Sequence, residues 1–295
     1  MDRRRDRVLA CETMLCHQTT VIAPGFQALL HEHHLDSVEA VYQCSAGDII
    51  TRSGSTEVRR ITLGSGAQSE TLFIKKYWVN KPSQLWRGMF RGTFFGCSKV
   101  RREYANLARL RDMGLDAPAR VAFGEERKAG WLVRSYLISQ GVPAPTTLHQ
   151  FIRDQLPALC GEEARQARQA LIENLALSTR RLHEHHFVHH DYFWRNILLN
   201  GLSLEHFFLI DAHKGRIWHS WSDGHARACD LASLDAPAPY FFRRAERLRF
   251  FLRYRNHRRL DDQDKALIRE SLRLAAPMRE NQLRRVMGSG AARQP

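Results

Sequence analysis

The sequence predicts an α+β protein of two parts, a strand-rich part followed by a helix-rich part. Residues 46–79 alternate β-branched and apolar residues with polar ones between Gly and Ser turns, which is typical of antiparallel strands joined by tight hairpins. After residue 148 the apolar residues recur at helical spacing instead. A turn-rich segment at 140–150 separates the two patterns, so we interpret it as a linker between two lobes.

Four segments are expected along the chain. Residues 1–45 form an N-terminal extension that is helical or irregular, 46–140 a small lobe with an antiparallel sheet and one main helix, 141–287 a mostly helical lobe, and 288–295 a tail that is disordered. The main helix of the first lobe has Val100, Tyr104, Leu107 and Leu110 at helical spacing. It ends at Gly114, with Pro118 beyond it, which is a common helix stop.

Helical spacing in the second lobe is clearest at residues 162–186, where Leu171, Leu175 and Leu182 lie along one stripe. Two short apolar runs after it, NILL and HFFLI, flank a Gly-containing turn and predict a small hairpin. From about residue 239 the chain is basic and helical. We find no internal repeat.

Composition indicates an intracellular protein with anionic partners. Lys and Arg number 45 against 31 Asp and Glu, which gives a formal net charge of +14. The six cysteines are scattered and do not form the dense pattern of a small secreted domain. The N-terminus lacks the apolar segment of a signal peptide, and no run approaches the roughly 18 to 20 apolar residues that span a bilayer. We therefore expect a cytoplasmic protein that can rest against a membrane.

The stretch FVHHDYFWRNILL supplies the residues that phosphoryl transfer requires. His189, Asp191 and Asn196 have the spacing H-x-D-x-x-x-x-N, in which the Asp accepts a hydroxyl proton and the Asn binds a metal. Fifteen residues after Asn196, Asp211 ends an apolar strand and is the candidate for the principal Mg²⁺ ligand. His189 is the candidate for a scaffold of this loop.

The nucleotide-binding candidates lie upstream. Lys75 in LFIKK occupies the Lys position of a V-A-I-K strand, aimed at the α- and β-phosphates, and Glu103 on the following helix can pair with it. Lys76 would point to the opposite face of the strand. Each of these residues alone is a weak signal. Their joint order, followed by the H-x-D loop and a second Asp, predicts a protein-kinase-like fold with ATP and Mg²⁺ as cofactors.

The phosphate-binding loop is expected in the hairpin that precedes the Lys75 strand by two strands. That position selects Ser53, Gly54 and Ser55 in RSGST. The glycines of GSGAQ, at residues 64–68, lie only about one short strand before Lys75. We therefore interpret residues 64–68 as a plain turn.

Residues from about 47 to 254 resemble the protein-kinase-like superfamily, and most closely the lipopolysaccharide core kinases of the Kdo/WaaP family. The similarity lies in FIKKYW, REYANLARLRDMGLDAP, HHDYFWRNILL, LIDAHKGR and ACDLASL. The resemblance implies transfer of the γ-phosphate of ATP to a heptose or Kdo hydroxyl of the lipopolysaccharide inner core. It also implies that Asp230 braces the catalytic loop.

Two departures from protein kinases favour a small-molecule or glycolipid acceptor over a protein. Only 19 residues separate Asp211 from Asp230 and no A-P-E motif follows, so a docking platform for a protein substrate is missing. His190 stands where an arginine usually binds a phosphorylated activation loop. In addition, Phe193 stands where a Lys commonly reaches the transferred phosphate, and Arg195, Lys214 or a basic patch on the substrate side are candidates to replace it.

The basic charge and the aromatic residues of the chain indicate its binding partners. Residues 81–99 interleave Trp and Phe with Lys and Arg, which suits an anionic membrane face, although packing of the aromatics into the small lobe is equally open. We expect peripheral contact with the inner face of the inner membrane and a lipopolysaccharide core glycolipid, or another anionic small molecule, as acceptor. Nucleic acid would leave the catalytic residues unexplained, and no obligate protein partner is inferred.

Two alternatives stay open. A soluble kinase like the aminoglycoside phosphotransferases shares the H-x-D-x-x-x-x-N loop, but its cationic substrates need acidic pockets. A pseudokinase scaffold would usually have lost one of Lys75, Asp191, Asn196 or Asp211, and all four are present. The histidine-rich runs at 31–34 and 183–190 lack the spacing of a metal site, and apart from His189 we interpret them as structural or solvated.

Overall fold

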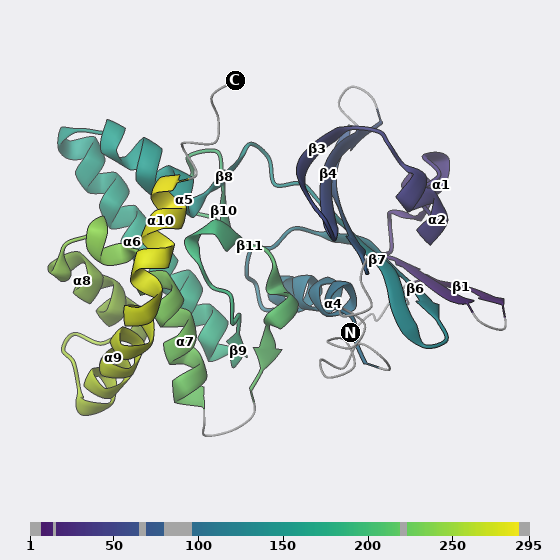
Figure 1. Cartoon of the computed structure of the whole chain (residues 1–295). Helices are drawn as coiled ribbons and strands as arrows, with labels where there is room; N and C mark the ends of the chain where they lie inside the picture. Colours follow the sequence, from purple (N-terminus) through teal and green to yellow (C-terminus); the bar gives the residue numbers. More distant parts are fainter. Residues whose placement is uncertain (1–6, 14–15, 65–68, 80–95, 219–222, 289–295) are drawn as a thin grey trace. The chain divides into compact units, whose positions relative to one another are not determined.

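The computed structural model describes residues 7–13, 16–64, 69–79, 96–218 and 223–288 (Figure 1). The chain folds into two compact units. The first comprises Met1–Ala108 and Pro118–Gly141, and the second comprises Arg109–Ala117 and Val142–Pro295. Among the described residues, no helix is long and apolar enough to cross a membrane.

The first unit is built on an antiparallel sheet. Its described strands are β1 (Arg7–Thr13), β2 (Cys16–Ile22), β3 (Asp48–Ser53), β4 (Thr56–Leu63), β5 (Glu70–Trp78), β6 (Arg120–Lys128) and β7 (Trp131–Gln140). They lie in the order β1-β2-β6-β7-β5-β4-β3. The hairpins predicted between residues 46 and 79 are β3–β4 and β4–β5 (Figure 1).

The N-terminal residues differ from the sequence-based expectation of a helical or irregular extension. Two strands, β1 and β2, precede the helices α1 (Gln27–Glu32) and α2 (Val38–Gln43), and β2 pairs with β6. The run Thr19-Thr20-Val21-Ile22 is β-branched throughout, which favours a strand. Its pairing partner lies 100 residues away, Ile22 opposite Ala122, so the local pattern gave little sign of it.

One face of this sheet is covered by α1 and α2. Leu30, Val38 and Val41 of these helices are fully or almost fully buried in one apolar cluster with Ile61 of β4 and Ile74 of β5. Burial of a Leu or Val side chain stabilises a fold by about 1.5–3 kcal/mol. The N-terminal residues therefore supply part of the hydrophobic core of the first unit.

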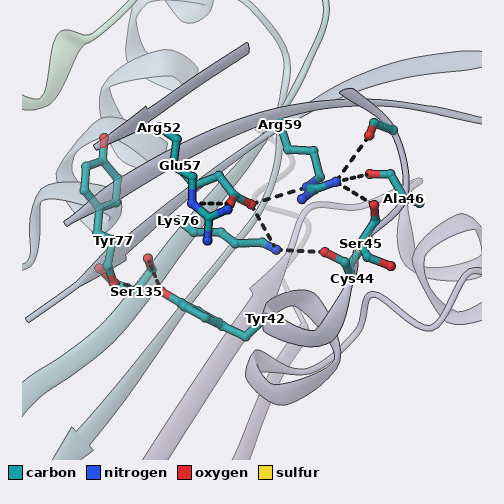
Figure 2. Close-up of polar contacts among 11 residues, drawn as sticks. Tyr42, Cys44, Ser45, Ala46, Arg52, Glu57, Arg59, Lys76, Tyr77 and Ser135 are labelled. Atoms are coloured by element: carbon teal, nitrogen blue, oxygen red, sulfur yellow. Dashed lines mark hydrogen bonds and ion pairs between the residues drawn. The ribbon is translucent and has the colours of Figure 1, made fainter. Parts of the chain in front are cut away.

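A polar network continues this face of the sheet beyond the apolar cluster (Figure 2). The Glu57 carboxylate lies 3.3 Å from Arg59 Nε and 3.6 Å from Lys76 Nζ, and all three side chains are almost fully buried. The cations also donate to main-chain carbonyls of the segment after α2, Lys76 to Cys44 and Arg59 to Ser45. This network, which we call the Glu57 cluster, ties the α2–β3 connection to β4 and β5.

Helix α4 (Lys99–Asp112) packs on β6. The ring of Tyr104 lies 4.9 Å from that of Phe123, and Ser98 Oγ donates to Glu125 at 2.6 Å. Val100 and Leu107 are also buried, as the helical spacing predicted. The residues of α4 up to Ala108 belong to the first unit.

The second unit is mainly helical. Its helices are α5 (Leu148–Gln150), α6 (Gly161–Glu184), α7 (Asp223–Asp235), α8 (Arg244–Arg255), α9 (Asp262–Ala275) and α10 (Arg279–Gly288). Short strands are β8 (Pro145–Thr147), β9 (Phe187–Val188), β10 (Ile197–Asn200), β11 (Phe208–Leu209) and β12 (Arg216–Ile217). The predicted stripe of α6, Leu171, Leu175 and Leu182, is buried, and β10 pairs with β11 as the predicted hairpin. The α+β class predicted from the sequence is confirmed.

Candidate active site

In the first unit, Lys75 and Glu103 form an ion pair. Lys75 Nζ donates to Glu103 Oε1 at 2.9 Å, and the Glu103 side chain is only 3% exposed. Successive side chains of a strand point to opposite faces, so Lys75 points toward α4 while Lys76 enters the Glu57 cluster. The predicted pairing is therefore present, and its use in holding nucleotide phosphates stays a prediction.

The predicted phosphate loop lies at the tip of the β3–β4 hairpin. Ser53 pairs with Thr56, so Gly54 and Ser55 form the two-residue turn. A Cβ on Gly54 would meet nothing within 4 Å, so there is open space on that side of the turn. The register places Val58 opposite Lys75, two residues beyond Thr56. The alternative glycine pair, at 64–68, lies mostly outside the described residues.

In the second unit, the loop after β9 carries Asp191. The side-chain amide of Asn196 donates to the carbonyl of Asp191 at 2.8 Å, which closes the loop on itself. Two cations approach the Asp191 carboxylate: Arg195 Nη2 lies 3.2 Å and Lys214 Nζ 3.6 Å from Oδ1. The carboxylate is thus fixed in position between two cations.

His189 joins this loop to the segment that carries Asp211. Its ring is fully buried, and Nε2 lies 3.1 Å from the carbonyl of Ile210, the residue before Asp211. Burial lowers the pKa of His189, so the ring is neutral and Nε2–H is the donor in this bond. His189 acts as a scaffold in this geometry, which agrees with the role expected for it.

Asp230 on α7 holds the backbone of the same loop. It is fully buried and accepts the main-chain N–H of His189 at 2.7 Å and of His190 at 2.8 Å. A carboxylate that accepts backbone N–H bonds in a buried site fixes the backbone strongly, because each bond is charge-assisted. The predicted brace is therefore present.

Two further residues support Asp230 and were not predicted. His183 Nε2 lies 3.4 Å from Asp230 Oδ2, and His183 Nδ1 lies 2.9 Å from the Tyr254 hydroxyl. The sequence analysis assigned His183 only to a group of structural or solvated histidines and named no partner for it. Its position seven residues after Ala176 and four after Thr179, on a buried face of α6, was the available signal that it is buried.

Asp211 and Asn196 lie at the same end of the β10–β11 hairpin. Ile197 pairs with Leu209, and the N–H of Ile210 donates to the carbonyl of Asn196 at 3.0 Å. Asp211 has φ 57° and ψ 34°, the left-handed conformation that is uncommon outside glycine and is concentrated at functional sites.

These two residues fit a magnesium ion by their chemistry. The amide nitrogen of Asn196 is used by the Asp191 carbonyl, which leaves its oxygen as a ligand. Carboxylate and amide oxygens are ligands that Mg²⁺ prefers.

The fold is kinase-like. A solved structure described as "WaaP in complex with acyl carrier protein" matches with a TM-score of 0.60 and 21% identity, and the match covers 91% of this chain and 99% of that chain. A search of curated proteins gave no significant match.

A family model described as lipopolysaccharide kinase (Kdo/WaaP) matches residues 50–251, more than half of the 295-residue chain. The chain therefore belongs to the lipopolysaccharide kinase (Kdo/WaaP) family, as the sequence motifs indicated.

Proposed function

We propose that this protein transfers the γ-phosphate of ATP to a sugar hydroxyl, of heptose or Kdo, in the lipopolysaccharide inner core. The observation that carries the proposal is the catalytic loop, in which Asp191 is fixed by Asn196 on one side while Asp230 holds the backbone N–H groups of His189 and His190 on the other. Family membership supports the lipopolysaccharide acceptor.

Each site residue has a distinct task in the proposed reaction. The Asp191 carboxylate accepts the hydrogen of the attacking hydroxyl and aligns its oxygen. Lys75, oriented by Glu103, binds ATP phosphates, and the backbone of residues 53–55 covers them. Asn196 and Asp211 would hold Mg²⁺, which neutralises phosphate charge when bound.

The chain between the metal ligand and the brace supports a glycolipid or small-molecule acceptor. After Asp211 the described chain makes one short turn at Ala212–Lys214, forms β12 and reaches α7 at Asp223. Residues 219–222 lie outside the described residues. This connection leaves little room for the long activation segment on which protein substrates dock.

Membrane contact is part of the proposal. The net charge of +14 favours the anionic inner face of the inner membrane. Residues 80–95, which contain most of the aromatic and basic segment expected to make this contact, lie outside the described residues. Sedimentation with vesicles containing anionic lipid, at low and high salt, tests it: binding that salt reverses is the expected result.

A protein partner is a further possibility to test within this proposal. The similar WaaP structure is described as a complex with acyl carrier protein. The sequence analysis inferred no obligate protein partner. Size-exclusion chromatography of the purified chain with acyl carrier protein decides between the two, because a stable complex elutes earlier than either component.

The central experiment follows radiolabelled γ-phosphate of ATP into purified inner-core lipopolysaccharide with Mg²⁺ present. Wild type should label the lipid and Asp191→Ala should not, while Asp262→Ala, at an Asp side chain that is 97% exposed on α9, should behave as wild type. Label on an added aminoglycoside instead would favour a soluble small-molecule kinase. Nucleotide binding without any transfer would favour the pseudokinase scaffold.

A further inference from the structure

Two cations share one oxygen of the catalytic carboxylate. Arg195 comes from the catalytic loop itself, four residues after Asp191, and Lys214 comes from the turn that follows Asp211. Both cations therefore lie beside the carboxylate that is expected to act on the acceptor hydroxyl. Cations at this place suit a phosphoryl group, which carries negative charge on three oxygens.

Arg195 is held in place by an aromatic ring and has unused hydrogen-bonding capacity. Its guanidinium lies over the ring of Phe193, 4.3 Å from the ring centroid, a favourable cation–π distance. Nη1 is buried and has no hydrogen-bond partner among the described residues. A buried donor without an acceptor is unfavourable, so an acceptor is expected to fill this place when the site is occupied.

The position of Phe193 explains why an arginine is needed. Protein kinases commonly carry a Lys two residues after the catalytic Asp, and in this chain that place belongs to Phe193. The cation has moved two residues along, to Arg195, and still reaches Asp191 Oδ1. A planar guanidinium can bond a carboxylate and a phosphate oxygen at the same time, since it has five N–H donors in a rigid fork.

We infer that Arg195 is a catalytic residue of the proposed phosphoryl transfer, which bonds Asp191 through Nη2 and the transferred phosphoryl group through Nη1. Lys214 is the weaker second cation, because its side chain is 52% exposed against 32% for Arg195 and it lies farther from Oδ1. The inference rests on the proposed function.

The step balances without any further reactant. The acceptor hydroxyl oxygen forms a bond to the γ-phosphorus, and its proton passes to the Asp191 carboxylate. The bond between the γ-phosphorus and the β,γ-bridging oxygen breaks, and its electron pair stays on ADP. Arg195 contacts the equatorial oxygens of the moving group, where a preorganised cation stabilises the transition state more than the ground state.

The experiment compares kcat, KM for ATP and acceptor, and the Kd of ATP in full-length variants. Arg195→Ala should lower kcat about 10²- to 10³-fold, the usual cost of removing one preorganised donor, with the Kd of ATP changed by less than about threefold. Lys214→Ala should lower kcat about tenfold or less. Arg180→Ala is the matched control, since Arg180 is also 32% exposed and pairs with a carboxylate four residues away, and it should leave kcat unchanged.

A double variant that moves the positive charge distinguishes a catalytic role of Arg195 from a structural one. In Phe193→Lys/Arg195→Ala the charge returns to the position two residues after Asp191, and kcat should recover at least about tenfold over Arg195→Ala. A kcat of Arg195→Ala within threefold of wild type overturns the inference. So does a loss that appears together with a lowered unfolding midpoint and is not reversed by the relocated Lys.

ATP hydrolysis by the same proteins without acceptor distinguishes this inference from the proposed function. If wild type hydrolyses ATP but labels no lipopolysaccharide, and Arg195→Ala abolishes the hydrolysis, the proposed acceptor is wrong and the role of Arg195 stands. If wild type labels lipopolysaccharide and Arg195→Ala does so equally well, the acceptor stands and the role of Arg195 is wrong. Absence of both activities in wild type overturns both.

Discussion

Removing the charge of Glu57 should destabilise the first unit far more than removing a charge at its surface. In Glu57→Gln, the buried cations Arg59 and Lys76 lose their carboxylate and keep only neutral acceptors, the Gln amide oxygen and main-chain carbonyls (Figure 2). Arg52, the third cation near Glu57, is 68% exposed and is stabilised by water.

The expected cost follows from the burial of the two cations that remain. Breaking a buried ion pair by removing one partner typically costs about 3–5 kcal/mol, and we expect the lower end because Gln keeps the volume and one acceptor oxygen. Lys76→Met should cost less, about 1–2 kcal/mol, since it removes a buried charge along with one hydrogen bond to Cys44. Burial already lowers the pKa of Lys76, which indicates that the cation is costly there.

The assay is urea unfolding of the full chain followed by circular dichroism, for wild type, both single variants and Glu57→Gln/Lys76→Met. The double variant should be more stable than Glu57→Gln alone, because no Lys is left buried without its carboxylate. Asp48→Asn on β3 is the matched control, since its pair with Arg60 is exposed on both sides, and it should cost less than about 0.5 kcal/mol. If Glu57→Gln costs no more than Asp48→Asn, the reasoning about this cluster is refuted.

Three other predictions concern the site. Asp230→Asn leaves one main-chain N–H of the catalytic loop facing an NH₂ group, so it should destabilise the protein by about 2–3 kcal/mol in urea unfolding and lower kcat; unchanged kinetics would refute the brace. Lys75→Met should raise the Kd of ATP about tenfold or more in calorimetry, with Arg180→Ala as control. The pKa of His189 is lowered in the folded chain, so below the usual value of 6.5 the unfolded chain binds a proton that the folded chain does not. The free energy of unfolding should therefore fall as the pH falls, by up to about 1.4 kcal/mol per pH unit. His189→Gln should flatten this slope.

In the first lobe, sequence patterns predicted the elements that depend on residues close in sequence, but not the pairing of distant strands. Alternation predicted the hairpins of residues 46–79, and helical spacing predicted α4, because both depend on neighbours close in sequence. The pairing of β2 with β6 depends on residues 100 positions apart, and a short β-branched run gives no partner. The family match begins at residue 50, so it also leaves out α1 and α2, which cover Ile61 and Ile74.

The residues of the site also divide into those that local sequence patterns predict and those whose contacts depend on the fold. Motif spacing selected Asp191, Asn196 and Asp211 as candidates, since kinase-like proteins carry these residues in a fixed order and spacing. Arg195 was one of several candidates to replace the missing Lys charge, and only the loop geometry shows its contact with Asp191. The support of Asp230 by His183 joins α6 to α7, so it depends on helix packing that no local pattern reports.

The order of strands in the first sheet has a consequence for synthesis on the ribosome. The strand β2 can pair with β1 on one edge as soon as both are made, but its other edge stays unpaired until β6, ending at Lys128, has left the exit tunnel. At about 5–20 residues per second, those 100 residues take about 5–20 seconds to translate. During that interval the edge of β2 and the apolar faces of α1 and α2 lack their final partners, and such edges are the ones that aggregate or recruit chaperones. Nascent chains stalled before residue 120 should therefore bind chaperone, and chains stalled well beyond residue 140 should release it.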